Sequence, residues 1–171
     1  MTLIHEILTN AFHRKATDNN TYHFLDEKVV ILVSGKDTNG QFAVLRVIKP
    51  ANQGPPLHVH ENEDETFYVV RGKMIFYSEG EVIEVNAGEY FFAPRGKAHR
   101  FVTGDEETEF IITSYSAGFE SFVKALGTPV PADAPLPQVG PPTEEKIIGL
   151  VNASKPFGIT YPDIEKAMSK K

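Results

Sequence analysis

The chain of 171 residues contains no cysteine. Disulfide bonds and thiolate metal ligands are therefore excluded, and any metal ion must be held by histidine, aspartate or glutamate. Clustered positive charge is also missing, since no run of lysine and arginine is longer than the two lysines in the terminal Ser-Lys-Lys. With 17 basic and 23 acidic residues, the net charge is −6. Nucleic-acid binding relies on basic clusters, so we expect no nucleic-acid partner.

Long hydrophobic runs are lacking too. The longest continuous apolar run covers only residues 29–33, whereas a helix that spans a bilayer needs about 20 apolar residues. The first 15 residues lack a basic start followed by a continuous apolar core, which is the mark of a secretory signal. We therefore expect no membrane partner and a cytoplasmic location.

Short segments rich in β-branched and aromatic residues follow one another from residue 22 to residue 117, and turn residues separate them. Residues 28–35 and 41–50, for example, flank Asn39 and Gly40, a pair that favours a tight hairpin. No helical pattern of the length needed for parallel crossovers lies between the segments. The pattern predicts an all-β fold of about eight mostly antiparallel strands, which is a double-sheet, jelly-roll-like barrel.

The character of the sequence changes in residues 118–171. Residues 119–126 carry apolar side chains at helical spacing, and six prolines occur in residues 127–142. Thr143 is a suitable N-cap for a second helix, and Pro162 for the start of a third. We expect a single domain, residues 1–171, in which this extension packs on the barrel core or on a partner subunit. An amphipathic segment at residues 3–12 also needs a partner surface, so we expect a homodimer.

Two histidines and a glutamate stand at spacings that suit a metal site. On a strand, His58 and His60 would point to one side about 7 Å apart, close enough to share an ion. Glu65 shares its strand face with Phe67, and a carboxylate that points into an apolar interior is costly unless paired or coordinated. His99 follows a turn and begins another strand. We predict one divalent transition metal ion, Fe, Mn, Ni, Co, Cu or Zn, held by His58, His60, Glu65 and His99.

The same residues, with several glycines and a proline, form a recognisable pattern. The first part reads His-x-His, four residues, Glu, six residues, Gly; the second reads Gly, five residues, Pro-x-Gly, two residues, His. The positions are His58, His60, Glu65, Gly72, Gly88, Pro94, Gly96 and His99. The pattern resembles the two motifs of the cupin superfamily. Gly54 stands closer to the first histidine than the family's opening glycine does, and Thr103 replaces its closing asparagine.

The resemblance implies a cupin barrel around the metal ion. The single barrel with its proline-rich connector is similar to bacterial single-cupin proteins of the quercetin 2,3-dioxygenase type. In that group, substrate binds the metal through an ionisable hydroxyl, and the motif glutamate accepts its proton. Carried over, Glu65 is both a ligand and the catalytic base of a dioxygenase that acts on a small aromatic or flavonol-like substrate. The alternatives are a non-oxidative isomerase or lyase, and a small-molecule-binding module without turnover.

Two further expectations concern the surroundings of the site. The barrel phenylalanines either fill the core or contact an aromatic substrate, and side-chain parity does not separate these roles. The acidic run at residues 61–64 is expected to form a solvated loop between strands. The candidate substrate-pocket residues are Phe67, Phe76, Phe101 and Phe110.

Overall fold

The computed structural model describes residues 11–138 and 140–170. Most of the predicted amphipathic segment, residues 3–10, therefore lies outside the described residues. The strands are β1 (Thr21–Phe24), β2 (Glu27–Val33), β3 (Ala43–Lys49), β4 (Val59–His60), β5 (Asp64–Arg71), β6 (Lys73–Ser78), β7 (Glu81–Asn86), β8 (Tyr90–Ala93), β9 (His99–Thr103), β10 (Thr108–Tyr115), β11 (Thr128–Pro129) and β12 (Ile159–Thr160). The helices are α1 (Phe119–Leu126), α2 (Glu144–Ser154), the 3-10 helix η1 (Lys155–Phe157) and α3 (Pro162–Met168).

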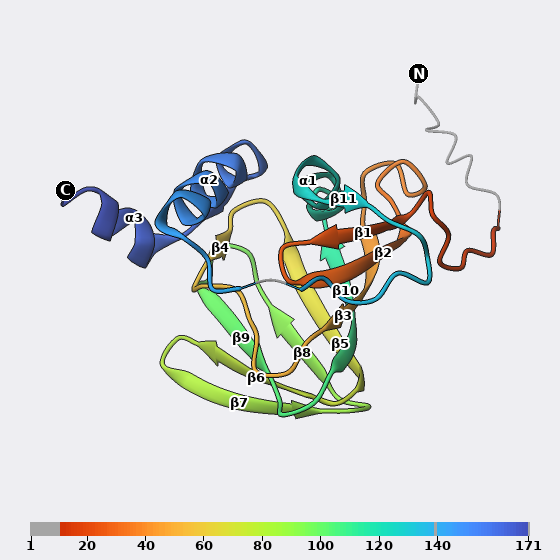
Figure 1. Cartoon of the computed structure of the whole chain (residues 1–171), viewed down its shortest axis with the longest axis horizontal. Helices are drawn as coiled ribbons and strands as arrows, with labels where there is room; N and C mark the ends of the chain where they lie inside the picture. Colours follow the sequence, from red (N-terminus) through yellow and green to blue (C-terminus); the bar gives the residue numbers. More distant parts are fainter. Residues whose placement is uncertain (1–10, 139, 171) are drawn as a thin grey trace, which may run out of the picture.

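The described strands form three sheets, and they pair antiparallel throughout. A seven-stranded sheet has the order β11-β1-β2-β3-β10-β5-β8, a three-stranded sheet has the order β7-β6-β9, and β12 pairs with β4. The strands curl around a common interior, and the three α-helices lie on one side of them (Figure 1). The predicted all-β, jelly-roll barrel with short, mainly C-terminal helices is confirmed.

Two turns show why particular glycines stand where they do. Asn39 and Gly40 have φ angles of 52° and 78°, which allow the predicted hairpin between β2 and β3 to turn tightly. Gly72 joins β5 to β6 with a φ of 80°, and a Cβ atom at this position would lie 2.6 Å from Oγ1 of Thr108. The first motif therefore ends in a glycine because both the backbone and the neighbouring strand require it.

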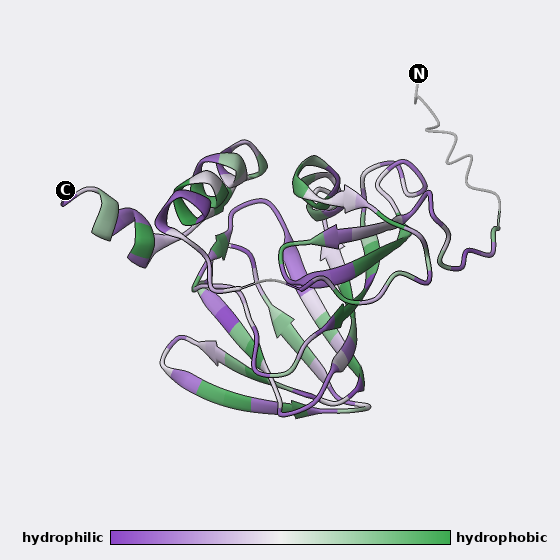
Figure 2. Ribbon diagram, viewed as in Figure 1, coloured by the Kyte–Doolittle hydropathy of each residue, from purple (hydrophilic) through white to green (hydrophobic). Residues whose placement is uncertain are grey.

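The barrel interior is built from alternate residues of the strands. Hydrophobic and hydrophilic residues alternate along several strands in Figure 2, as expected when one face of a sheet packs on a core. Strand β3 alternates buried and half-buried positions over its whole length. Its buried row runs through Ala43, Leu45 and Val47 and ends at a charged residue, Lys49.

The C-terminal extension packs on the barrel of its own chain. Val151, Ile159 and Tyr161 belong to the same buried hydrophobic cluster as the barrel residue Phe67. Helix α2 begins as expected, because the hydroxyl of Thr143 accepts a hydrogen bond from the backbone N–H of Lys146 at 3.3 Å. Association into a homodimer stays a prediction. Among the described residues, no helix has the length and apolar character needed to cross a membrane.

Two short strands in the extension were not predicted. Strand β11 lies in the proline-rich connector and pairs with β1, and β12 pairs with β4, where Ile159 is opposite His60. Each has only two residues, too few to show a periodic hydrophobic pattern. The pairing of β12 with β4 matters for function, because it places the C-terminal extension beside a predicted metal ligand.

Candidate metal centre

The four predicted metal ligands come together inside the barrel. His60 lies in β4, Glu65 in β5 and His99 at the start of β9. The backbone of His58 is paired with that of His99 through two hydrogen bonds, of 3.0 and 2.9 Å. Strand pairing therefore unites residues that are up to 41 positions apart in the sequence. All four side chains are buried, with exposed fractions of 7, 3, 2 and 1% for His58, His60, Glu65 and His99.

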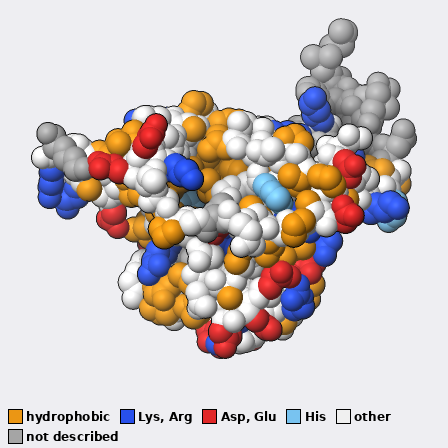
Figure 3. Space-filling model, viewed as in Figure 1, with side chains coloured by type: hydrophobic (Ala, Val, Ile, Leu, Met, Phe, Trp, Pro, Cys, Tyr) orange, Lys and Arg blue, Asp and Glu red, His pale blue; other side chains and the backbone are white. Residues whose placement is uncertain are grey.

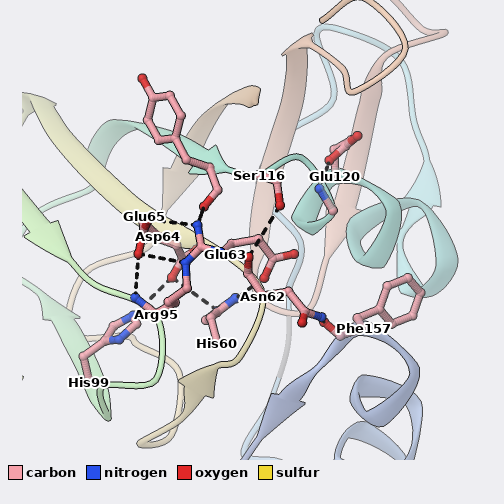
Figure 4. A network of polar contacts seen from close by, with 12 residues as sticks. His60, Asn62, Glu63, Asp64, Glu65, Arg95, His99, Ser116, Glu120 and Phe157 are labelled. Carbon is pink, nitrogen blue, oxygen red and sulfur yellow. Dashed lines mark hydrogen bonds and ion pairs between the residues drawn. The ribbon is translucent and has the colours of Figure 1, made fainter. Parts of the chain in front are cut away.

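Their ligand atoms converge on the Glu65 carboxylate. Potential ligand atoms of His58, Glu65 and His99 all lie within 4.8 Å of one another. Oε2 of Glu65 lies 3.1 Å from Nε2 of His99 and 3.2 Å from Nε2 of His60, so His60 reaches the same group. Figure 4 shows His60, Glu65 and His99 pointing toward one another from three different strands.

The opposite ring nitrogen of each histidine is engaged elsewhere. Nδ1 of His58 donates to the carbonyl oxygen of Pro56 at 2.8 Å, and Nδ1 of His99 donates to that of Lys97 at 3.2 Å. These bonds place the proton on Nδ1 and leave the Nε2 lone pair available for a metal. With Nδ1 of His60 held by a carboxylate, the three imidazoles and Glu65 form a donor set that fits a divalent transition metal ion.

The carboxylate that contacts Nδ1 of His60 belongs to Glu63, which is part of the acidic run predicted to be solvated. Glu63 is only 2% exposed, and its Oε2 atom lies 3.1 Å from Nδ1 of His60. Asp64 is half-buried and pairs with Arg95 at 2.9 Å. Only Glu61 and Asn62 are exposed. The expectation of a solvated loop is therefore wrong for Glu63, because the buried imidazole beside it offers a partner that compensates for lost hydration.

Electrostatics favour the metal-binding protonation states of His58 and Glu65 but oppose that of His60. Burial, aided by His99 and His60, lowers the pKa of His58 to about 3, so this imidazole is neutral at pH 7. Burial by itself would raise the pKa of Glu65, but the charges of His60 and His99 outweigh it and lower the pKa to about 2. A neutral imidazole and an ionised carboxylate are the forms that bind metal ions. Burial by itself would lower the pKa of His60, but the charge of Glu65 and the hydrogen bond with Glu63 outweigh it and raise the pKa. A metal ion that binds His60 must therefore displace a proton from this ring.

A large cavity opens beside these residues. Its volume is about 580 Å³, and His58, His60 and Glu65 form part of its wall. Of the four candidate pocket phenylalanines, Phe67 and Phe101 line this cavity. Phe76 and Phe110 do not line it; their side chains have no exposed surface and pack in the barrel core.

The C-terminal extension covers one side of the cavity. Tyr161 follows β12, and its ring centroid lies 6.1 Å from that of His58. Helix α2 contributes Ile147 and Leu150 to the lining, and the preceding loop contributes Pro141 and Pro142. In the space-filling view, hydrophobic side chains gather between α2 and α1 (Figure 3). The cavity is therefore shaped by residues more than 90 positions apart, which lie on the barrel and on the extension.

Comparison with known proteins agrees with this geometry. Residues 44–114 match the family model described as a cupin domain. The chain therefore contains a cupin domain at residues 44–114.

The cupin is similar to proteins with different activities. It is 30% identical to quercetin 2,3-dioxygenase of Bacillus subtilis over 99 residues, which are 58% of this chain but 29% of that protein. It is 31% identical to an oxalate-binding protein of Thermotoga maritima over 39% of this chain and 55% of that protein. The structure of the polyketide cyclase RemF from Streptomyces resistomycificus superposes with a TM-score of 0.50 and 27% identity, covering 63% of this chain and 80% of that chain. The chain thus covers less than a third of the Bacillus subtilis protein and little more than half of the Thermotoga maritima protein.

Two residues of the site were not predicted from the sequence, for different reasons. Glu63 stands in a charged run beside a motif histidine, and such runs are usually solvated; its spacing of three from His60 was the available signal. Tyr161 stands 62 residues beyond the last motif histidine, after the proline-rich connector. No local pattern could place it in the cavity of the cupin, because its position depends on the long-range pairing of β12 with β4.

Proposed function

We propose that this cupin is a metal-dependent dioxygenase that acts on a small aromatic compound of the flavonol type. One observation carries the proposal: His58, His60 and Glu65 are exposed to one cavity whose wall is otherwise rich in aromatic side chains. A volume of about 580 Å³ is in the range of small-molecule sites. The similarity to the Bacillus subtilis quercetin 2,3-dioxygenase supports the choice of substrate class.

The metal would be held by the Nε2 atoms of His58, His60 and His99 together with the carboxylate of Glu65. The donor set suits one ion of Fe, Mn, Ni, Co, Cu or Zn per chain. When bound, such an ion acidifies a substrate hydroxyl and holds the substrate beside dioxygen. Both oxygen atoms enter the product of a dioxygenase, so the reaction needs no external reductant.

Glu65 would act as the general base. Its low pKa keeps it ionised at neutral pH, which is the form that can accept the proton of a substrate hydroxyl. Glu63 keeps the His60 ring in place through its contact with Nδ1. The aromatic walls, including Phe67 and Phe101, would orient a planar ring system, and the C-terminal extension would shield it from water.

The test is oxygen consumption by the full-length protein. The protein is loaded separately with Fe(II), Mn(II), Ni(II), Co(II), Cu(II) and Zn(II), its metal content is measured, and quercetin is added. Wild-type protein and Glu61→Gln should consume oxygen, because Glu61 is exposed and lies outside the site. Glu65→Gln should lose at least about 100-fold in rate, the usual contribution of a general base. The proposal fails if stoichiometrically loaded wild-type protein consumes no oxygen with any of these metals.

A non-oxidative role is the second candidate. The Thermotoga maritima relative is called an oxalate-binding protein, and the similar RemF is a polyketide cyclase. The same buried donor set could polarise a carbonyl or enol without oxygen. This isomerase, lyase or binding role predicts that the metal-loaded protein binds or converts an aromatic ligand equally well in nitrogen and in air.

A further inference from the structure

Three charged residues line the cavity in addition to the metal ligands: Glu27 and Lys49, which are buried, and Asp26, which is half-buried. Nζ of Lys49 lies 2.5 Å from Oδ1 of Asp26 and 3.0 Å from Oε2 of Glu27. Lys49 is 2% exposed and Glu27 is 6% exposed. All three residues line the same cavity of about 580 Å³ as His58, His60 and Glu65.

The packing of the barrel does not require charged residues at these positions. Glu27 and Lys49 occupy positions at the ends of the rows through which β2 and β3 otherwise bury Val29, Leu45 and Val47. Removing charges from water is expensive, and apolar residues of similar size often stabilise a protein as well as a buried ion pair does. A polar wall inside a cavity, by contrast, is useful to a ligand that carries a polar group at that point.

The composition of the group selects the chemistry of that ligand. Two carboxyl groups surround one ammonium, so an anionic ligand would meet surplus negative charge. Two of the three hydrogens of Lys49 are engaged by Asp26 and Glu27, and within the described part of the chain no hydrogen bond involves the third. A hydroxyl group fits this arrangement, because it can accept from Lys49 and donate to a carboxylate oxygen of Glu27.

We propose that Asp26, Glu27 and Lys49 form a second subsite of the cavity, which binds a hydroxyl group on the end of the substrate remote from the metal centre. The inference rests on the proposed function, since it takes the chelating end of an aromatic ligand to lie at the metal. Apart from Gln53 and Lys146, the remaining lining is mainly apolar, including Phe24 and Ile112. The cavity therefore suits a ligand with an apolar ring system, a group that binds the metal and a further hydroxyl group.

Calorimetric binding measurements on the full-length, Zn(II)-loaded protein under nitrogen test the subsite without turnover. The probes are 3-hydroxyflavone, which has only the chelating end, 3,7-dihydroxyflavone and 3,4′-dihydroxyflavone, which add one remote hydroxyl, and 4′-carboxy-3-hydroxyflavone. In the wild type, at least one dihydroxyflavone should bind about tenfold more tightly than 3-hydroxyflavone, as expected for a hydrogen bond to a charged group. The carboxylate probe should bind more weakly than that dihydroxyflavone.

Two double variants make the test specific. In Glu27→Gln with Lys49→Met, the preference for the remote hydroxyl should fall close to one. In Asp26→Asn with Glu27→Gln, the charge of Lys49 is no longer balanced, so the carboxylate probe should gain about tenfold. The second variant keeps the shape of the group but leaves the buried ammonium of Lys49 without a counter-charge, which is destabilising. The two variants perturb the group in opposite ways, so each tests the subsite where the other does not fold. The control is Lys73→Met with Glu84→Gln, which removes a partly exposed ion pair of 3.3 Å between β6 and β7 and should change nothing.

The inference is overturned by an unchanged hydroxyl preference in the first variant, or by no gain for the carboxylate probe in the second. It is equally overturned if the wild type binds the carboxylate as tightly as the hydroxyl, or binds none of the probes. Because no oxygen is present, a failed oxygen-uptake assay leaves these results intact. Loss of the proposed dioxygenase activity and loss of the subsite are therefore told apart.

Discussion

Oε2 of Glu63 lies 3.1 Å from Nδ1 of His60, and both side chains are almost fully buried. The contact fixes the ring so that Nε2 of His60 faces Glu65, 3.2 Å away. Glu63 therefore contacts Nδ1 of His60 in the same way as the backbone carbonyl groups of Pro56 and Lys97 contact Nδ1 of His58 and His99. In metalloproteins such partners orient the ligand and raise its basicity.

Replacing Glu63 tests this positioning role. Glu63→Gln should weaken metal binding by about 10- to 100-fold, the usual effect of losing the partner of a metal-ligating histidine. Competition with a metal-sensitive dye measures the affinity, and the exposed neighbour provides the control Glu61→Gln. Equal affinities for the two variants would show that Glu63 does not position the ligand. Thermal unfolding of the metal-free proteins separates this effect from a general loss of stability.

The ligand set itself is tested by removing two of its histidines. His58→Ala with His60→Ala should strip the ion from purified protein, because the remaining Glu65 and His99 are too few to retain it in competition with a chelator. His13→Ala is the matched control, since His13 is exposed and far from the motifs in sequence. Elemental analysis of both proteins after equal treatment decides the matter. Full metal occupancy in the double variant would refute the proposed centre.

Much of this site could be read from the sequence, and the rest has a common physical reason for being missed. Strand parity and turn spacing indicate His58, His60, Glu65 and His99, since alternation along a strand is a local property. Glu63, Lys49 and Tyr161 could not be identified in this way. Charged residues near strand ends are normally solvated. Only long-range pairing across the barrel buries Glu63 beside His60 and brings Lys49 and Tyr161 to one cavity.

The covering role of the C-terminal extension can be tested by truncation and by a smaller change. Removal of the residues after Gly127 should weaken flavonol binding more than it reduces metal content, because the ligands stay and the cover is lost. That deletion also removes β12, the partner of the strand that carries His60. Ile147→Ser is therefore a cleaner variant, with Ile148→Ser as its control: both side chains are half-buried, and only Ile147 lines the cavity.

We expect Ile147→Ser to raise the dissociation constant for the flavonol about fivefold, because it removes apolar surface that the ligand would cover. Ile148→Ser should leave binding unchanged. Titration calorimetry with metal-loaded protein measures both values. If the two variants bind the flavonol as the wild type does, and the truncated protein does too, the extension has no part in the substrate site.

The glycine that closes the first motif is expected to matter for stability more than other turn glycines. Gly72 and Gly80 have nearly the same φ angles, 80° and 86°, so a side chain strains the backbone at either position by about 1–2 kcal/mol. A Cβ atom at Gly80 meets nothing within 4 Å, whereas at Gly72 it meets Oγ1 of Thr108 at 2.6 Å and Cα of Thr108 at 3.1 Å. Gly72→Ala should therefore lower the free energy of unfolding by about 1–3 kcal/mol more than Gly80→Ala does, as overpacking usually does. Urea unfolding of the metal-free proteins measures both losses, and equal losses would mean that β10 moves aside freely at Thr108.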